Sequence, residues 1–557
     1  MGTPDIDTLE SRKGNLPLIL LLVIVFLLLV AYTFAANIHG DGKTHTLYAR
    51  EIAETGYLLK YEPYSLCPGA EETTYLPIYY PQTSHVLMSL FYIVGQENAL
   101  KLFSPILGVL SAFFAYALLR HVSKYGALAA AFLTVLLNIQ RFIMVPLIEQ
   151  LLLFGMLATL YFYYLFLKKR ERKYVFLTGL FLGLVLATKQ QGLVFCFVIL
   201  IHAGLTVIAE KARSGDFALL RQIVPIFAIA AIVSSGPLLD QLDRNGTIIE
   251  IGNFNIPPFC QPKLPMDAES YAKIQDIIGY DVIYSSPWET LGAYSLHIFF
   301  YQGSVGFLRE HAIAGSLLSL FICLVGLMGA LYIFKKDRLV ASLVCSVFLA
   351  EFVVTYTQNS RPFQYNNVGL AMVGIMVVFG LLNLREHTRW GGVLGFTANL
   401  AIPVVFVLGA LLCCISTVLV PSWGDSDRLG SDHIQAYQEM GEFVSDTIPG
   451  NAVFLTGGGT GTAFQYYARR RTVWISEWGG ANVPLIFSQS EEVALHWLKF
   501  YGVDYIFIDM RQTGYHGLSD YVPAEGLMEY IDSSPHFKRS YGLDPASAQL
   551  RIYEVIY

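Results

Sequence analysis

Residues 16–36 read LPLILLLVIVFLLLVAYTFAA, and a short polar stretch, GDGKTHTLYAREIAETG, follows at residues 40–56. The apolar run is long enough for a membrane helix, which needs about 20 mostly apolar residues. It is too long for the apolar core of a signal peptide, and no clear small-residue cleavage site follows it. We therefore interpret the run as an uncleaved first membrane helix and the polar stretch as the start of the loop after it.

Composition indicates an integral membrane protein. The chain has 557 residues, of which 54% are hydrophobic and only 14% charged, and its mean hydropathy is +0.49. A soluble globular chain carries about 25% charged residues, so most of this chain is expected to face lipid. The net charge of −6 is spread along the sequence and forms no basic stripe, which argues against a nucleic-acid partner.

Eleven apolar segments have the length and composition of membrane helices. They lie at residues 16–36, 99–119, 126–145, 150–167, 174–188, 191–208, 223–239, 312–334, 339–356, 367–383 and 393–420. Residues 1–420 are therefore predicted to form an α-helical polytopic domain with about eleven spans.

The loops between these segments are of two kinds, which alternate. Short basic loops lie near residues 120–124, 168–173, 211–221, 335–338 and 385–389, and longer acidic or neutral loops at 37–98, 139–149, 240–311 and 356–366. Basic loops stay in the cytoplasm. The alternation predicts a multi-pass cell-membrane protein whose N-terminus is cytoplasmic, with the long loops and the C-terminal tail on the outer side.

Residues 421–557 have the composition of a soluble domain. Helical periodicity at residues 433–446 and 490–501 alternates with short apolar strands at residues 452–456, 471–475, 503–509 and 550–556. Strands alternating with helices predict a small α/β domain. The predicted topology places this domain outside the cytoplasm.

The first outer loop, residues 37–98, is predicted to contain two helices. Residues 43–55 have helical periodicity, and residues 84–95 form an apolar stretch that is too short to span a bilayer. Both are typical of helices that lie along the membrane surface.

Two acidic residues on the predicted outer side are candidates for catalysis. Asp41 lies in the polar stretch after the first span, and Glu149 begins the apolar run of a later helix. A carboxylate at the mouth of a helical bundle can act as a general base or bind a metal ion, and ionisable residues at membrane depth are commonly functional. The alternatives are an ordinary loop cap at Asp41 and a carboxylate favoured by the helix dipole at Glu149.

Basic residues on the same predicted side could bind an anionic group. Lys189 interrupts two apolar runs, and Arg361, with Tyr365 close behind, precedes an apolar helix. A guanidinium binds phosphate through two parallel hydrogen bonds. Lys189 could equally belong to a polar turn from which its ammonium reaches the headgroups.

Five further residues remain open at this point. Lys43 and His45 are neighbours of Asp41, and His45 and His85 are either metal ligands or bases, or ordinary polar residues. Cys67 and Cys260 lie in the two long outer loops. Disulfides persist outside the cytoplasm, so the two cysteines either form a bridge between these loops or remain separate.

The order of these features resembles the GT-C superfamily of integral membrane glycosyltransferases. The resemblance is carried by Gly40-Asp41, Thr44-His45, the run from Tyr48 to Gly56, Tyr79-Tyr80-Pro81 with His85, Glu149, Ala187-Thr188-Lys189 and Gly502-Val503-Asp504-Tyr505-Ile506. It covers roughly residues 16–420, with the tail as an accessory. Within the superfamily the chain is most similar to the protein mannosyltransferase-like and aminoarabinose transferase-like proteins of archaea and bacteria.

The resemblance implies an inverting transferase that moves a hexosyl or pentosyl group from a polyprenyl-phosphate donor of the dolichyl type. The acceptor would be a protein, a lipid or a glycan. An acid of the first outer loop is the implied catalytic centre, which matches Asp41, and a second outer acid assists, which matches Glu149. The family's usual acidic partner beside the first acid is missing, because Gly42 follows Asp41.

The residues described above also predict a substrate site and a candidate metal site. The donor's phosphate would contact Lys189 and Arg361, and His85, Tyr365 and Lys43 complete the expected set of substrate-binding residues. A divalent ion, if the enzyme uses one, would have Asp41, His45 and Glu149 as candidate ligands.

Two further expectations limit this interpretation. The segment SEWGG at residues 476–480 is a poor match to the WWDYG motif of oligosaccharyltransferases, so transfer of a whole oligosaccharide to asparagine is not expected. A transporter or flippase would explain the spans equally, but it predicts repeated halves that the sequence does not show. A receptor or scaffold would leave the polar first loop unexplained.

Overall fold

The computed structural model describes the chain as two compact units. The described residues are 16–35, 38, 41–68, 73–78, 81–138, 147–189, 191–214, 217–245, 312–358, 367–387, 431–475, 491–510, 531–542 and 549–557. Unit 1 comprises Met1–Ala35, Lys101–Pro237 and Tyr284–Val420, and unit 2 comprises Ala36–Leu100, Leu238–Ile283 and Pro421–Tyr557.

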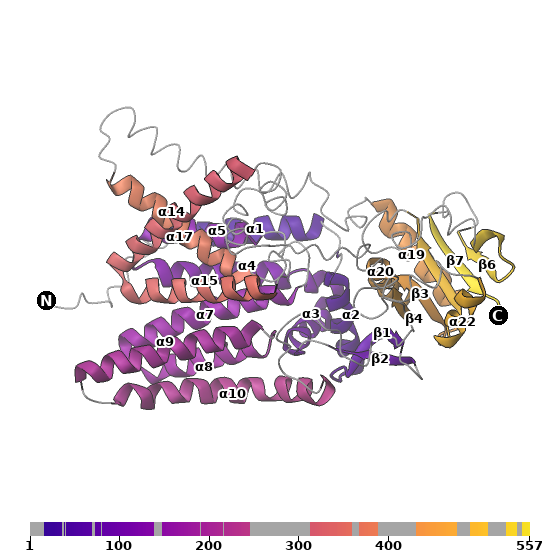
Figure 1. Ribbon diagram of the computed structural model, residues 1–557, viewed down its shortest axis with the longest axis horizontal. Coiled ribbons are helices and arrows are strands. Elements are labelled where there is room, and N and C mark those ends of the chain that lie inside the picture. Colours follow the sequence, from indigo (N-terminus) through magenta and orange to yellow (C-terminus); the bar gives the residue numbers. More distant parts are fainter. Residues whose placement is uncertain are drawn as a thin grey trace. The chain divides into compact units, whose positions relative to one another are not determined.

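Unit 1 is helical (Figure 1). Its helices are α1 (Leu16–Ala35), α4 (Phe103–Leu119), α5 (Lys124–Leu136), α7 (Ile148–Lys169), α8 (Arg172–Leu186), α9 (Gln191–Ser214), α14 (Ala312–Lys336), α15 (Arg338–Gln358), α17 (Asn367–His387) and most of α10 (Ala218–Asn245). α14 and α17 approach closely because each has a glycine at the contact. A Cβ atom on Gly329 would lie 1.7 Å from the Met376 carbonyl oxygen, and one on Gly380 would lie 1.9 Å from that of Val325. Small residues allow this backbone approach between membrane helices.

The helices of unit 1 have the apolar character of membrane spans. Among the described residues, Ile148–Lys169, Gln191–Ala212, Ala218–Asp243 and Ser316–Lys336 are long and apolar enough to cross a bilayer, and a fifth span is counted if Thr83–Leu100 and Phe103–Leu119 are taken as one broken helix. Helices also lie within the other predicted spans up to residue 383, although the span 126–145 is helical only as far as Leu136, and residues 139–145 and 393–420 lie outside the described residues. The membrane location is supported, and the number of eleven spans stays a prediction.

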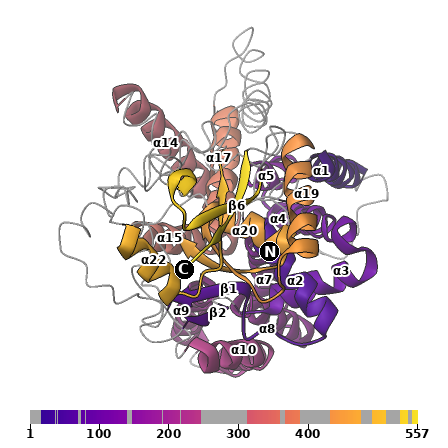
Figure 2. The ribbon, with the colours of Figure 1, turned by 90° about the vertical axis from the view of Figure 1, so that its right-hand side faces the viewer.

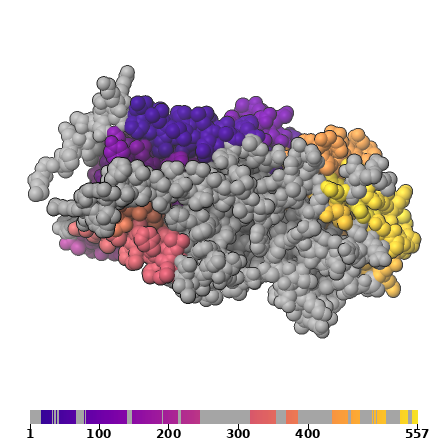
Figure 3. All heavy atoms as spheres, turned by 90° about the horizontal axis from the view of Figure 1, so that it is seen from above, coloured from indigo at the N-terminus to yellow at the C-terminus, as the bar shows by residue number. Residues whose placement is uncertain are grey.

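The helices of unit 1 differ in how far their side chains are exposed. α7 is enclosed, with nearly every residue from Ile148 to Tyr164 buried or half-buried. α1 lies at the surface, as Figure 3 shows, and Leu20, Ile24 and Leu27 are more than half exposed. An apolar helix with an exposed apolar face fits a lipid-facing position, so α1 matches the membrane helix predicted from residues 16–36.

Unit 2 contains a seven-stranded sheet in the order β2-β1-β4-β3-β5-β7-β6. The strands are β1 (Tyr61–Pro68), β2 (Thr73–Pro77), β3 (Val453–Gly457), β4 (Arg471–Ile475), β5 (Tyr505–Asp509), β6 (Phe537–Tyr541) and β7 (Leu550–Val555). The four central strands, β1, β4, β3 and β5, run parallel to one another. At the two ends of the sheet the pairs β2–β1, β5–β7 and β7–β6 are antiparallel. The four strands predicted from the sequence correspond to β3, β4, β5 and β7, while β1, β2 and β6 were not predicted.

The sheet has an apolar core on each face. Alternating side chains of β5 divide between the two cores, since Ile506 and Ile508 face one cluster and Phe507 faces the other, as the period of two in a strand requires. α22 (Glu491–Phe500) covers the first cluster, and α19 (Ser431–Thr447) and α20 (Gly458–Ala468) cover the second. Figure 2 shows α19 and α22 on opposite sides of the sheet.

The first polar loop belongs to the same unit as this sheet. It supplies β1, β2, α2 (Asp41–Thr55) and α3 (Thr83–Leu100), and Ser65 and Leu66 of β1 pair with Thr472 and Val473 of β4. The sequence predicts one domain at residues 1–420 and another at 421–557, and this division stays a prediction; in the structure residues 36–100 are grouped with the C-terminal segment. The boundary at residue 420 lies outside the described residues.

Candidate functional site

Asp41 is the first residue of α2, and its backbone position is described while its side chain is not. α2 had been expected to lie along the membrane surface. It is instead enclosed by protein, because polar His45, Thr46 and Arg50 are buried together with apolar Leu47. α2 packs against α3 and α20 of its own unit. The helix that begins with Asp41 is therefore held on several sides, which fixes the position of its first turn.

His45 and His85 meet inside unit 2. His45 lies one turn after Asp41 on α2, and its Nδ1 is 2.9 Å from Nε2 of His85 on α3. Both rings are buried, and Tyr48 packs edge-on against His85. Positions four apart on a helix share a face, so the first turn of α2 and the histidine pair occupy one region. The sequence identified both histidines but gave no reason to bring them together.

Lys43 is buried between aromatic rings of the C-terminal segment. Its Nζ lies 5.8 Å from the ring centroid of Tyr437 and 5.6 Å from that of Tyr467. Arg50 lies two turns further along α2, and its guanidinium carbon is 5.5 Å from the ring centroid of Tyr466. Cation–π contacts of this kind are worth up to about 2 kcal/mol when desolvated. Both cations thus attach α2 to α19 and α20, and a substrate-binding role for Lys43 stays a prediction.

Glu62 on β1 is a perturbed acid that the sequence did not reveal. Burial raises the pKa of its carboxyl to about 7, although hydrogen bonds with Tyr48 and Ser65 act in the opposite direction. Tyr48 is also the residue that packs against His85. Glu62 is therefore linked through one tyrosine to the histidine pair, in the unit that contains Asp41.

Unit 1 contains a second polar cluster, around Lys189. Nζ of Lys189, in the break between α8 and α9, lies 2.6 Å from Oε1 of Glu149 in the first turn of α7. Both side chains are more than 90% buried. Lys189 also acts electrostatically on Glu351 of α15, which is 2% exposed. Lys189 thus pairs with an acid 40 positions away and acts electrostatically on another more than 160 positions away.

Burying an ion pair costs free energy because two charges are removed from water, and the attraction between the charges offsets this desolvation penalty only in part. Retaining Glu149, Lys189 and Glu351 among apolar helices therefore points to a functional cluster. A lysine that reaches the lipid headgroups would extend to the surface, whereas the side chain of Lys189 is buried. The sequence motifs do not single out Glu351. The residue is nevertheless recognisable, because it is the lone acid inside the apolar run VASLVCSVFLAEFVV.

Several predicted residues are not placed together by the structure. Arg361, Tyr365 and Cys260 lie outside the described residues, as does the side chain of Cys67. Asp41 and Glu149 belong to different units, so their pairing stays a prediction. Among the side chains that the structure describes, no three histidine, cysteine, aspartate or glutamate residues gather as metal ligands would.

Comparison with known proteins gives a family match for part of the chain. Residues 77–235 match the family model described as dolichyl-phosphate-mannose-protein mannosyltransferase. Comparison with curated proteins gives no match.

Solved structures share the fold over nearly the whole chain. The archaeal oligosaccharyltransferase AglB from Archaeoglobus fulgidus, in complex with an inhibitory peptide and a dolichol-phosphate, is 16% identical, with a TM-score of 0.60 over 95% of this chain and 73% of its own. ArnT from Cupriavidus metallidurans, bound to undecaprenyl phosphate, is 11% identical, with a TM-score of 0.55 over 98% of both chains. The family match and the shared fold confirm the resemblance drawn from the sequence motifs: this is a membrane protein with the fold of the GT-C glycosyltransferases.

Proposed function

We propose that the protein is a membrane glycosyltransferase that moves a sugar from a polyprenyl-phosphate donor to a protein, lipid or glycan acceptor. The observation that carries the proposal is the fold shared over 98% of both chains with ArnT, a protein solved with undecaprenyl phosphate. AglB, solved with a dolichol-phosphate, adds a second fold neighbour that binds a polyprenyl phosphate. The name of the family matched by residues 77–235 supports the same donor class.

In the proposed mechanism the donor phosphate binds near Lys189, and Asp41 acts as the general base. Asp41 takes the proton from the acceptor hydroxyl, the hydroxyl oxygen attacks the anomeric carbon in line, and the lipid phosphate leaves with inversion. An ammonium has three donor hydrogens, so Lys189 can keep its bond to Glu149 while it donates to a phosphate oxygen. Glu149 then orients the lysine, and Arg361 is proposed as a second phosphate ligand.

A divalent metal ion is compatible with the residues present in unit 2. Two nitrogen ligands of one tetrahedral ion, each about 2.0–2.1 Å from it, are about 3.4 Å apart, so the 2.9 Å between His45 Nδ1 and His85 Nε2 would have to widen by about 0.5 Å around an ion. With Asp41 one turn before His45, we propose Asp41, His45 and His85 as the ligands, while Glu149 stays only a sequence-based candidate. A bound ion would neutralise charge on the departing phosphate.

Transfer from a radiolabelled polyprenyl-phosphate sugar by the purified full-length chain tests the proposal. Asp41→Asn keeps the size of the side chain and removes its basicity, so transfer should fall by at least about 100-fold while the melting temperature is unchanged. Asp446→Asn, an exposed aspartate of α19, is the matched control and should transfer normally. Near-normal transfer by Asp41→Asn would remove Asp41 from the catalytic role. Binding and transbilayer movement of the donor without transfer would instead identify a flippase.

A further inference from the structure

One end of unit 1 carries a cavity that the proposed transfer reaction does not use. It has a volume of about 440 Å³ and lies where α7, α9, α14 and α15 come together. Its charged lining residues are Lys168, Arg170, Lys336, Arg338 and Asp337. The lysines and arginines come from the two basic loops near residues 168–173 and 335–338, which lie far apart in the sequence.

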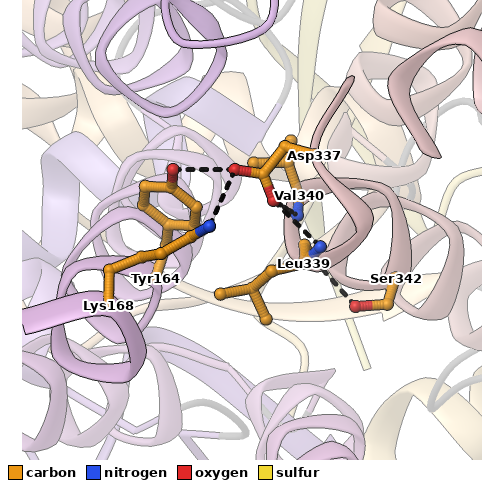
Figure 4. Close-up of polar contacts among 6 residues, drawn as sticks. All are labelled: Tyr164, Lys168, Asp337, Leu339, Val340 and Ser342. Carbon is orange, nitrogen blue, oxygen red and sulfur yellow. Dashed lines mark hydrogen bonds and ion pairs between the residues drawn. The ribbon is translucent and has the colours of Figure 1, made fainter. Parts of the chain in front are cut away.

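The single carboxylate of the lining is already engaged by its neighbours, as Figure 4 shows. Oδ1 of Asp337 accepts the backbone N–H groups of Leu339 and Val340 at 3.0 and 3.3 Å, which caps the first turn of α15. Its Oδ2 accepts the hydroxyl of Tyr164 at 2.9 Å and lies 3.3 Å from Nζ of Lys168. Asp337 therefore neutralises one lysine at most.

The remaining cations exceed the available negative charge. Arg170 pairs with Glu210 of α9 at 2.6 Å. Lys336 lies over the ring of Tyr332, and Arg338 lies over that of Phe334; within the described part of the chain neither makes an ion pair. Four cations thus face two carboxylates, and the excess of positive charge in one cavity favours an anionic ligand.

The helices that line the cavity carry exposed apolar side chains on their other faces, which suit acyl chains. Leu205 and Ile208 of α9, the helix that contributes Thr206 to the cavity, are 62% and 65% exposed. Leu331 of α14, one turn before Lys336, is 53% exposed. Exposed leucine and isoleucine next to basic side chains and tyrosines are what a helix presents where hydrocarbon meets headgroups. A soluble anion would use the charges and leave this apolar surface without a partner.

We propose that this cavity binds the phosphate-bearing headgroup of an anionic membrane phospholipid, with the acyl chains along α9 and α14. The phosphate oxygens accept hydrogen bonds from Lys336 and Arg338, whose heads have no carboxylate partner among the described residues. The site is independent of the Lys189 cluster and of the proposed transfer reaction.

Equilibrium binding to the full-length protein in a neutral detergent tests the proposal, with phosphatidylglycerol, phosphatidylcholine and glycerol 3-phosphate as probes. We expect phosphatidylglycerol to bind about 10-fold or more tightly than the other two. The double variant Lys336→Gln/Arg338→Gln should lose this preference. The control Lys173→Gln/Lys211→Gln removes the same charge from the same region outside the cavity and should keep it.

Asp337→Asn should strengthen phosphatidylglycerol binding, whereas Lys336→Gln/Arg338→Gln should weaken it. Asparagine still caps a helix but lacks the negative charge, so phosphatidylglycerol should bind about three-fold more tightly to this variant, a gain that general destabilisation cannot produce. Equal loss of the preference in both double variants, or no gain in Asp337→Asn, would overturn the assignment to this cavity. Binding of glycerol 3-phosphate as tight as that of phosphatidylglycerol would overturn the lipid as the ligand.

Discussion

Nε2 of Gln465 donates a hydrogen bond to Oγ of Ser65 at 3.0 Å, although the two residues lie 400 positions apart. Gln465 is on α20 and Ser65 is on β1, so this buried contact joins the first polar loop to the C-terminal sheet. The exposed pair Arg469–Glu54, at 3.1 Å, lies beside the same junction. The segment that begins with Asp41 is thus part of the C-terminal fold and not an independent loop.

Gln465→Ala should lower the free energy of unfolding of unit 2 by about 1–3 kcal/mol, because it leaves the buried hydroxyls of Ser65 and Thr472 without this donor. Thermal or denaturant unfolding in detergent, followed by fluorescence, measures the change. The control Gln435→Ala removes an exposed glutamine that bonds only one turn away on α19, and it should change stability by less than about 0.5 kcal/mol. Equal effects of the two substitutions would contradict a structural role for the junction.

Lys189→Met should destabilise unit 1 by about 3–5 kcal/mol, because it leaves the buried carboxylate of Glu149 without the opposite charge 2.6 Å away. Adding Glu149→Gln to this variant should restore part of the loss, since the uncompensated charge is then removed. Unfolding of the single and double variants measures the coupling. Lys173→Met breaks an exposed pair with Glu171 and serves as the control, with no measurable change in stability expected. A double variant no more stable than Lys189→Met would argue against a direct pair.

Glu62 should make the stability of unit 2 depend on pH. Burial raises the pKa of Glu62 to about 7, so the folded state holds a proton that the unfolded chain releases near pH 4.5. The stabilisation is therefore complete below pH 4.5 and is lost as the pH rises through 7, by up to about 3 kcal/mol. Unfolding at pH 4.5 and 8 measures the difference. Glu62→Gln should remove this contribution, and Glu442→Gln, an exposed glutamate of α19, should retain it; a pH profile unchanged in Glu62→Gln would exclude Glu62 as the source.

His85→Ala should reduce the amount of divalent metal that copurifies with the protein, if His45 and His85 together bind an ion. Elemental analysis of protein purified without chelator and dialysed against metal-free buffer gives the stoichiometry. His496→Ala, on α22 and exposed, is the matched control and should keep the wild-type content. An unchanged metal content in His85→Ala would mean that the 2.9 Å contact is only a hydrogen bond between two rings.

Local sequence patterns predicted many elements because their causes are local. The periodicity of residues 43–55 and 433–446 corresponds to α2 and α19, and the apolar run of residues 16–36 corresponds to α1. β1 and β2 could not be predicted this way. β1 contains two prolines and a residue with positive φ, Tyr64 at 65°, and its strand geometry depends on pairing with β4 from the far end of the chain.

Local sequence patterns are enough to indicate that this is a membrane protein, that its C-terminal segment alternates strands and helices, and that Asp41, Glu149 and Lys189 are polar residues at exceptional positions. Hydropathy and periodicity decide these points because each depends on neighbouring residues alone. The fold, by contrast, pairs Lys189 with Glu149 within electrostatic range of Glu351, brings His45 to His85, and gives the C-terminal sheet two strands from the first loop. These contacts join residues about 40 to 400 positions apart, and what brings such residues together is the burial of apolar side chains throughout the fold.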